Sequence, residues 1–149
     1  MSVNEIAFGK RLRNELAERG FKFDRIESHA TAPGIPDTAW VHHTGESGWL
    51  EIKETENQPT KIDYRPRQAL WLDEHWKRGG NSATILHVKN GDHLFLIPGV
   101  HSIQAERNFT ILLNLPDLPL YHLVLSKLDA WDTLARLIKL LRYADLPRR

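Results

Sequence analysis

Residues 34–54 carry the pattern that most restricts how this chain of 149 residues folds. A turn over residues 34–37, with the sequence GIPD, opens an apolar stretch over residues 38–43. A polar turn over residues 44–48 separates that stretch from a second one over residues 48–54. Two apolar stretches joined by a short polar turn predict the strands of a β-hairpin.

Three charged side chains are expected to converge at one end of this hairpin. Glu51 and Lys53 are two residues apart, so both leave the same face of one strand, while Leu50 points the other way. Asp37 lies where the first strand begins, and antiparallel pairing brings it beside Glu51. Two carboxylates and an ammonium group in one place are unfavourable unless they hold a divalent cation. The alternative is that Glu51 and Lys53 are solvated and that Asp37 caps a turn.

These motifs together resemble the PD-(D/E)xK nuclease superfamily, in particular its virus-type replication-repair nuclease (VRR-NUC) and Holliday-junction-resolvase branch. The motifs are the G-x-P-D turn ending at Asp37, the E-x-K of Glu51 and Lys53, and a Q-x-x-W-L that begins at Gln68. The similarity covers roughly residues 1–90. An isolated E-x-K is common in exposed strands, whereas the three motifs in this order and at this spacing are specific.

The resemblance implies a role for each matched residue. Asp37 and Glu51 would be metal ligands, and the backbone carbonyl of Ile52 would add a third oxygen. Lys53 would orient or activate the attacking water or stabilise the transition state, and Gln68 would contact a metal-bound water or the phosphate. The implied cofactor is Mg²⁺, with Mn²⁺ expected to substitute for it.

The sequence departs from the family pattern in its first helix. Related enzymes add a glutamate there, and the corresponding position in this chain is Gly9. Glu5 lies one helical turn earlier on the same face, so it is the candidate for that ligand. The number of protein ligands therefore stays open.

Basic residues precede the glutamine motif. Lys61, Arg65 and Arg67 are expected to contact DNA phosphates, which sets register without reading bases. His29, in the loop before Asp37, is the histidine expected near the site. The alternative is an ordinary exposed helix start with solvated cations.

Bulk properties exclude several other classes. The net charge is +1, so nucleic-acid binding has to come from a local patch. The chain has no cysteine, which excludes disulfides, thiolate zinc sites and cysteine nucleophiles. It shows no long apolar run, no signal-peptide pattern and no Gly-rich phosphate loop. We therefore expect a cytoplasmic protein with no membrane segment and no organic cofactor.

The remaining segments predict an alternation of helices and strands. Predicted helices cover residues 4–19, 66–78 and 100–107, and predicted strands cover residues 21–26, 82–89 and 93–98. Residues 55–64 are expected to form a surface loop, and residues 109–125 to hold one strand. Pro66 is expected in the first helical turn.

The last predicted helix follows Ser126, which is expected to cap it with Asp129 at the capping-box position. Its apolar stripe contains Leu128, Trp131, Leu134, Ala135, Ile138 and Leu141. Leu137 and Leu140 widen that stripe, so the helix either closes the core or also serves in docking or dimerisation.

We predict a single α/β domain over residues 1–149, with the nuclease motifs in residues 1–90 and further strand and helix elements in residues 91–149. Its fold is expected to be restriction-endonuclease-like, with a central mixed β-sheet flanked by helices. The expected function is a Mg²⁺-dependent endonuclease on branched or flapped DNA, working as a homodimer. The alternatives are a non-catalytic nucleic-acid-binding module on a nuclease fold and an RNA or single-strand nuclease.

Overall fold

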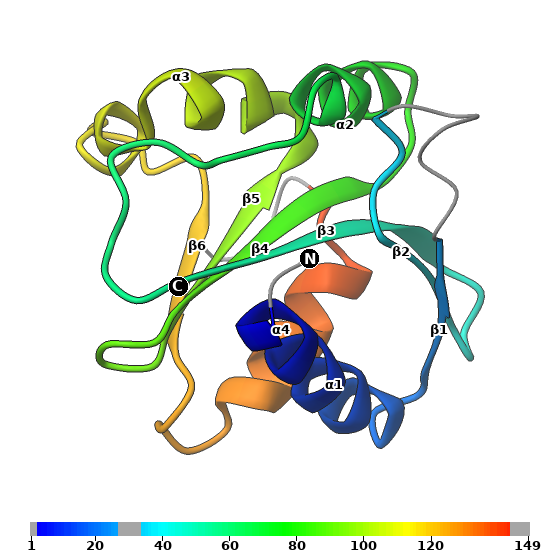
Figure 1. The fold of residues 1–149 in the computed structure, drawn as a ribbon. Helices are drawn as coiled ribbons and strands as arrows, with labels where there is room; N and C mark the ends of the chain where they lie inside the picture. Colours follow the sequence, from blue (N-terminus) through cyan, green and yellow to red (C-terminus); the bar gives the residue numbers. More distant parts are fainter. Residues whose placement is uncertain (1–2, 27–33, 144–149) are drawn as a thin grey trace.

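A mixed six-stranded sheet lies at the centre of the molecule, with its strands in the order β1-β2-β3-β4-β5-β6 (Figure 1). The computed structural model describes residues 3–26 and 34–143. The strands are β1 (Phe21–Arg25), β2 (Thr38–His42), β3 (Ser47–Thr55), β4 (Ser82–Val88), β5 (His93–Pro98) and β6 (Tyr121–Val124). The helices are α1 (Val3–Ala17), α2 (Gln68–Lys77), the short 3₁₀ turn η1 (Gly99–His101), α3 (Ser102–Leu113) and α4 (Ala130–Lys139). The predicted α/β class with a mixed sheet between helices is confirmed.

Strands β3 and β4 form the parallel pair of the sheet, and every other neighbouring pair is antiparallel. Two parallel strands need a crossover connection, which α2 supplies between them. The predicted hairpin forms as β2 and β3, with Thr38 opposite Leu50 and Val41 opposite Ser47. Gly45 in its turn has φ 104°, a left-handed conformation that glycine adopts without steric cost.

The helices cover both faces of the sheet (Figure 1). Helices α1 and α4 pack on the face to which β3 sends Leu50 and Ile52, both 1% exposed. Helices α2 and α3 pack on the other face, where Leu72 and Phe109 are fully buried. Each such side chain contributes roughly 1.5–3 kcal/mol through burial. None of the described helices is long and apolar enough to span a bilayer.

The segment before β6 differs from the prediction. The helix predicted over residues 100–107 forms as the end of η1 and the first half of α3, which continues through Phe109 to Leu113 before the chain reaches β6. Asn108 has non-helical angles (φ −162°, ψ 94°) and marks a kink directly after the last residue of the predicted helix. The helix continues past the kink because Phe109 and Leu112 are buried against the sheet.

The start of α4 is also different from the prediction. The helix begins at Ala130, and Asp129 precedes it in a left-handed conformation (φ 65°) with no side-chain cap. Leu128 is 91% exposed and does not belong to the apolar stripe. The Lys127 N–H donates to the Val124 carbonyl, and the Ala130 N–H donates to the Lys127 carbonyl. These two hydrogen bonds fold residues 124–130 into turns instead. The predicted Ser126 cap is therefore wrong.

The stripe of α4 is covered within the chain. Leu137 is 1% exposed and packs in the same core cluster as Leu134 and Ile138. Leu140 lies at the helix end and is half-buried. The helix thus closes the core, which is the simpler of the two predicted roles.

Residues 56–64 form a largely exposed loop after β3, as their polarity predicts, but two of its side chains are buried. Ile62 and Tyr64 are 3% and 7% exposed and belong to the core on the α2 and α3 face. The Ile62 N–H bonds to the Ala105 carbonyl, and the Phe109 N–H bonds to the Thr60 carbonyl. Contacts with α3, which lies far along the chain, therefore hold this segment in place.

Candidate active site

The hairpin brings Asp37 and Glu51 together where β2 begins. Because Thr38 lies opposite Leu50, the residue before Thr38 meets the residue after Leu50. The Asp37 backbone N–H donates a hydrogen bond of 3.0 Å to Glu51 Oε1. The structure therefore contains the juxtaposition that the hairpin pattern predicts.

Glu51 and Lys53 share one face of β3, on the side that α2 covers. Lys53 Nζ lies 3.4 Å from Glu51 Oε2. Glu51 is 1% exposed and the Lys53 side chain 13% exposed. The alternative in which both residues are solvated is therefore wrong.

The electrostatics of Glu51 are unusual. Burial first, and then the negative charge of Asp37, raise the pKa of Glu51 to about 7 from an ordinary 4.5. Lys53, the Asp37 N–H and Arg65 act in the opposite direction without restoring the ordinary value. A bound cation would favour the ionised form of such a carboxylate. Strongly perturbed groups of this kind are typical of functional sites.

The segment before α2 packs against the turn that carries Asp37. Arg65 Nη2 lies 3.1 Å from Asp37 Oδ1, so the structure pairs this predicted phosphate contact with a carboxylate. A Cβ on Gly34 would come within 2.7 Å of the Arg67 carbonyl oxygen, and Gly34 has φ 92°. Glycine is therefore required for this close approach. Arg67 is itself left-handed (φ 71°), which is why α2 starts at Gln68 and not at Pro66.

Gln68 is fully buried at the first position of α2. Its Oε1 accepts a hydrogen bond of 2.9 Å from the Arg65 backbone N–H. Its Nε2 has no hydrogen-bond partner in the described part of the chain. An unpaired buried amide is unfavourable, so this group is a donor that a ligand can satisfy. The alternative of an exposed helix start is wrong for Gln68.

Tyr64 belongs to the site although the sequence reasoning missed it. Lys53 Nζ lies 5.9 Å from the centre of the Tyr64 ring, and the Tyr64 hydroxyl is 2.6 Å from Thr84 Oγ1. Burial raises the pKa of Tyr64, so its hydroxyl stays protonated. The apolar residues on either side of Asp63, Ile62 and Tyr64, were the signal that could have revealed it.

The Ile52 carbonyl lies on the β2 side of β3. The Trp49 N–H bonds to the Asn81 carbonyl next to β4, and the direction of the backbone groups alternates along a strand. The N–H and C=O groups of Leu50 and Ile52 therefore point toward β2. The pairing of β2 with β3 ends at Thr38 and Leu50. The carbonyl is thus on the same side as Asp37.

The other predicted site residues are either exposed or outside what the structure describes. Lys61 and Arg67 are exposed, and His29 lies outside the described residues. Glu5 lies in α1, and its side chain is outside what the structure describes. Across residues 3–26 and 34–143, no three His, Cys, Asp or Glu side chains form a group able to hold a metal ion. Among the described residues, Asp37 and Glu51 are therefore the two predicted carboxylates that the structure brings together.

Comparison with known proteins supports the fold. The chain is similar in structure to Hjc, a Holliday junction resolvase from the hyperthermophilic archaeon Archaeoglobus fulgidus. The TM-score is 0.50 with 18% sequence identity, over 64% of this chain and 77% of the Hjc chain. The chain has a resolvase-like fold. No protein-family model matches it, and no curated protein matches it in sequence.

Proposed function

We propose that this protein is a Mg²⁺-dependent endonuclease that hydrolyses phosphodiester bonds in DNA. The observation that carries the proposal is the buried Glu51, whose pKa is raised to about 7 beside Asp37 and Lys53. A carboxylate held this way is stabilised by a cation in contact with it. The resolvase-like fold supports the same class of function.

The residues present fit Mg²⁺. Asp37, Glu51 and the Ile52 carbonyl are oxygen donors, which this hard cation prefers, and Mg²⁺ is commonly held by one or two carboxylates with water in its other positions. Mn²⁺ would substitute because it takes the same ligands. When bound, the ion would supply Lewis-acid stabilisation of the charge on the phosphate. Glu5 is the further ligand to test.

The protein's own groups then have distinct roles in the proposal. Lys53 donates to the attacking water or to the developing phosphate charge, and the Tyr64 ring holds its side chain. Gln68 donates through its unpaired Nε2. Arg65 leaves Asp37 and joins Arg67 on the phosphates of the bound strand. Water attacks in line, and the cut leaves a 5′-phosphate.

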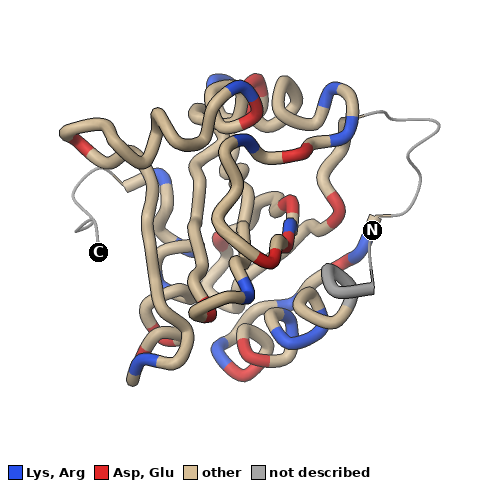
Figure 2. Tube along the Cα trace, turned by 60° about the vertical axis from the view of Figure 1, so that its left-hand side comes forward, with Lys and Arg blue, Asp and Glu red and all other residues tan. Residues whose placement is uncertain are grey.

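The proposed substrate is branched or flapped DNA bound by a homodimer. Basic and acidic segments are interspersed along α1 and over the other elements (Figure 2). A two-fold dimer would present one site to each strand.

One observation favours the alternative of a non-catalytic binding module. The described residues contain no group of three metal-ligating side chains, and Gly9 replaces the expected helix glutamate. A module kept only for binding would have no use for the buried Glu51, so we rank catalysis first. An RNA or single-strand nuclease would use the same site, because the reacting phosphate is common to both polymers.

The test is a cleavage panel of four-way junction, flap, linear duplex, single-stranded DNA and RNA. Each substrate is incubated with Mg²⁺, Mn²⁺ or EDTA and with wild type, Glu51→Gln and the exposed control Glu56→Gln. We expect metal-dependent cutting of branched DNA that is lost only in Glu51→Gln. Mg²⁺ should also raise the melting temperature of wild type but not of Glu51→Gln. Binding without cutting, together with no Mg²⁺ effect on melting, would establish the non-catalytic module instead.

A further inference from the structure

A cavity of about 670 Å³ opens at the start of β3, apart from the carboxylates of the candidate active site. Three segments form its walls: the β2–β3 hairpin, the end of α2 with the loop that follows, and the end of α4. Its side chains combine aromatic rings with cations. The lining includes Trp49, His75, Lys139 and Arg142.

The aromatic wall is fixed by stacking. The rings of Trp49 and Trp71 are 5.4 Å apart and meet edge to face, and the rings of Trp71 and His75 stack at 4.7 Å. Gly80 packs directly under His75, since a Cβ on Gly80 would come within 2.2 Å of the imidazole. Burial first, and then the charge of Arg142, lower the pKa of His75, so its ring is neutral at neutral pH. Trp49 and His75 thus line the cavity as half-buried, uncharged rings.

The opposite wall is basic. Arg142 is held in place because its guanidinium lies 4.1 Å from the Trp76 ring centre and donates a bond of 2.8 Å to the Trp76 carbonyl. Lys139 lies one turn earlier near the end of α4. Glu46 is the carboxylate in the lining, so two formal positive charges stand against one negative charge. The wall therefore favours an anion.

The cavity is connected to the candidate active site through two elements. Trp49 is two residues before Glu51 on the same face of β3, a separation of about 7 Å along a strand. Trp71 follows Gln68 by one turn on α2. The cavity is therefore within about one nucleotide of a phosphate placed at Glu51.

We infer that the cavity binds an unpaired nucleotide of the substrate strand, next to the phosphodiester that is cut. Its base stacks on Trp49 beside His75, and its phosphate contacts Lys139 and Arg142. Ring surfaces next to cations are the combination by which proteins hold single-stranded nucleic acid. The inference rests on the proposed function and narrows the substrate to DNA that has unpaired nucleotides, such as a flap or a junction opened at its centre.

The test measures binding of the full chain in EDTA, so that it does not depend on catalysis. Three probes are used: an oligothymidylate of about twelve nucleotides, a blunt duplex of the same length, and thymidine monophosphate. The variants are Trp49→Leu and the double variant Lys139→Gln/Arg142→Gln. The matched control is Arg107→Gln/Lys127→Gln, which removes two exposed cations outside the cavity. Circular dichroism checks that each variant is folded.

We expect both cavity variants to weaken binding of the single strand by about tenfold, and to change duplex binding less than twofold. The double variant should also reduce the salt slope for the single strand by about 1.4, and the control should not. Unchanged single-strand binding, or an equal loss for the duplex, would overturn the inference. It would also fail if the monophosphate bound as tightly as the oligonucleotide, because the cavity would then serve a free nucleotide.

The two proposals fail in different ways. If Glu51-dependent cleavage is observed but the cavity variants bind normally, the nuclease stands and this inference is overturned. If the cavity variants lose single-strand binding and no substrate is cut, the cavity stands as a binding site for unpaired nucleotides and the nuclease proposal is overturned.

Discussion

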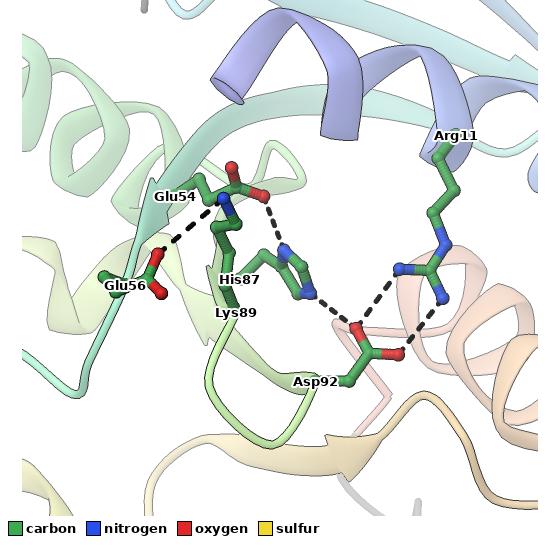
Figure 3. A network of polar contacts seen from close by, with 6 residues as sticks. All are labelled: Arg11, Glu54, Glu56, His87, Lys89 and Asp92. Atoms are coloured by element: carbon green, nitrogen blue, oxygen red, sulfur yellow. Dashed lines mark hydrogen bonds and ion pairs between the residues drawn. The ribbon is translucent and has the colours of Figure 1, made fainter. Parts of the chain in front are cut away.

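Two clusters of carboxylates and cations lie on opposite faces of β3. The Glu51 cluster, toward α2, consists of Asp37, Glu51, Lys53 and Arg65. The Glu54 cluster, toward α1, consists of Glu54, His87, Asp92 and Arg11 (Figure 3). Similar residue types thus occur three positions apart on one strand, and the two clusters differ in how fully their carboxylates are compensated.

The charged groups of the Glu54 cluster pair with one another. His87 lies 2.6 Å from Glu54 through Nδ1 and 2.6 Å from Asp92 through Nε2, so it can donate both bonds only when both ring nitrogens carry protons. Arg11 donates to both oxygens of Asp92, at 3.1 and 3.2 Å, which ties α1 to the β4–β5 turn (Figure 3). The Phe8 ring stacks on His87 at 4.1 Å. Burial raises the pKa of Asp92, but the bonds from Arg11 and His87 outweigh it and leave that pKa below its ordinary value.

The polar and charged groups of the Glu51 cluster are less fully paired. Lys53 lies 3.4 Å from Glu51, the pKa of Glu51 is raised to about 7, and Gln68 Nε2 has no partner among the described residues. A buried cluster that only holds a fold together is expected to satisfy its charges, as the Glu54 cluster does. The Glu51 cluster is therefore the one to which we assign ligand binding and chemistry.

The largest expected difference between the clusters is in cleavage. Glu51→Gln should lower the rate by about 10²–10³-fold because it removes a proposed ligand of the ion that would stabilise charge on the phosphate. Glu54→Gln should leave the rate within about threefold when assayed well below its melting temperature. Single-turnover cleavage of a flap substrate measures both. Equal losses in the two folded variants would remove the functional distinction between the clusters.

The second expected difference is in stability. Glu54→Gln should lower the free energy of unfolding by about 1.5–3 kcal/mol, since it replaces a charge-assisted bond to the buried His87 with a neutral one. Urea denaturation at neutral pH measures the change, with the exposed Glu56→Gln as control. A loss below about 0.5 kcal/mol would mean that the Glu54 cluster contributes little to the fold.

Glu51→Gln is expected to change the free energy of unfolding in the opposite direction. The folded pKa of about 7 lies above the ordinary 4.5, so the contribution of Glu51 to stability is complete below about pH 4.5 and is lost as the pH rises through about 7. Glutamine carries no charge, so the variant should be more stable than wild type by about 1–3 kcal/mol at about pH 8. Urea denaturation over a pH series without metal tests this. A stability difference that does not vary with pH would rule out a raised pKa at Glu51.

A smaller effect is expected from breaking the Arg65–Asp37 ion pair than from the changes above, and the Arg11–Asp92 pair serves as the comparison. If Arg65 leaves Asp37 to contact a phosphate, Arg65→Ala and Arg67→Ala should each reduce the salt slope of duplex binding by about 0.9. Arg11→Ala should not change the slope, because Arg11 stays on Asp92. Fluorescence anisotropy at several salt concentrations gives these slopes. A slope that Arg65→Ala leaves unchanged would mean that Arg65 remains an Asp37 partner in the complex.

The smallest effect is expected at the edge of the Glu54 cluster. Lys89 lies 3.7 Å from Glu56 (Figure 3), and their side chains are 41% and 69% exposed. Exposed pairs contribute little, so Lys89→Gln should change stability by less than about 0.5 kcal/mol. A larger loss in urea denaturation would show that the network extends to this pair.

Most of the candidate site follows from local rules. Strand alternation places Glu51 and Lys53 on one face, and hairpin pairing brings Asp37 beside Glu51. Both depend on neighbours within about 16 positions of the chain, so the sequence pattern is enough to predict them. The start of α2 at Gln68 was predicted to within two residues.

The elements that were predicted wrongly depend on distant contacts. α3 extends through Phe109 because the sheet covers that side chain, and Tyr64 is buried because α3 and β4 lie above its segment. Leu128 continues the apolar stripe in sequence but lies in a turn before α4. Hydrophobic spacing reports that a residue prefers burial, and it does not report which partner is available.

The sequence by itself therefore determined the α/β pattern, the hairpin and the side chains that meet at its base. Only the tertiary structure decided that Glu51 is buried and hard to ionise, that Arg65 binds Asp37, and that Trp49 and Arg142 line one cavity. The physical reason is that alternation and pairing act between neighbours on the chain. Desolvation and cavity shape depend instead on segments that folding brings together from far apart in the sequence.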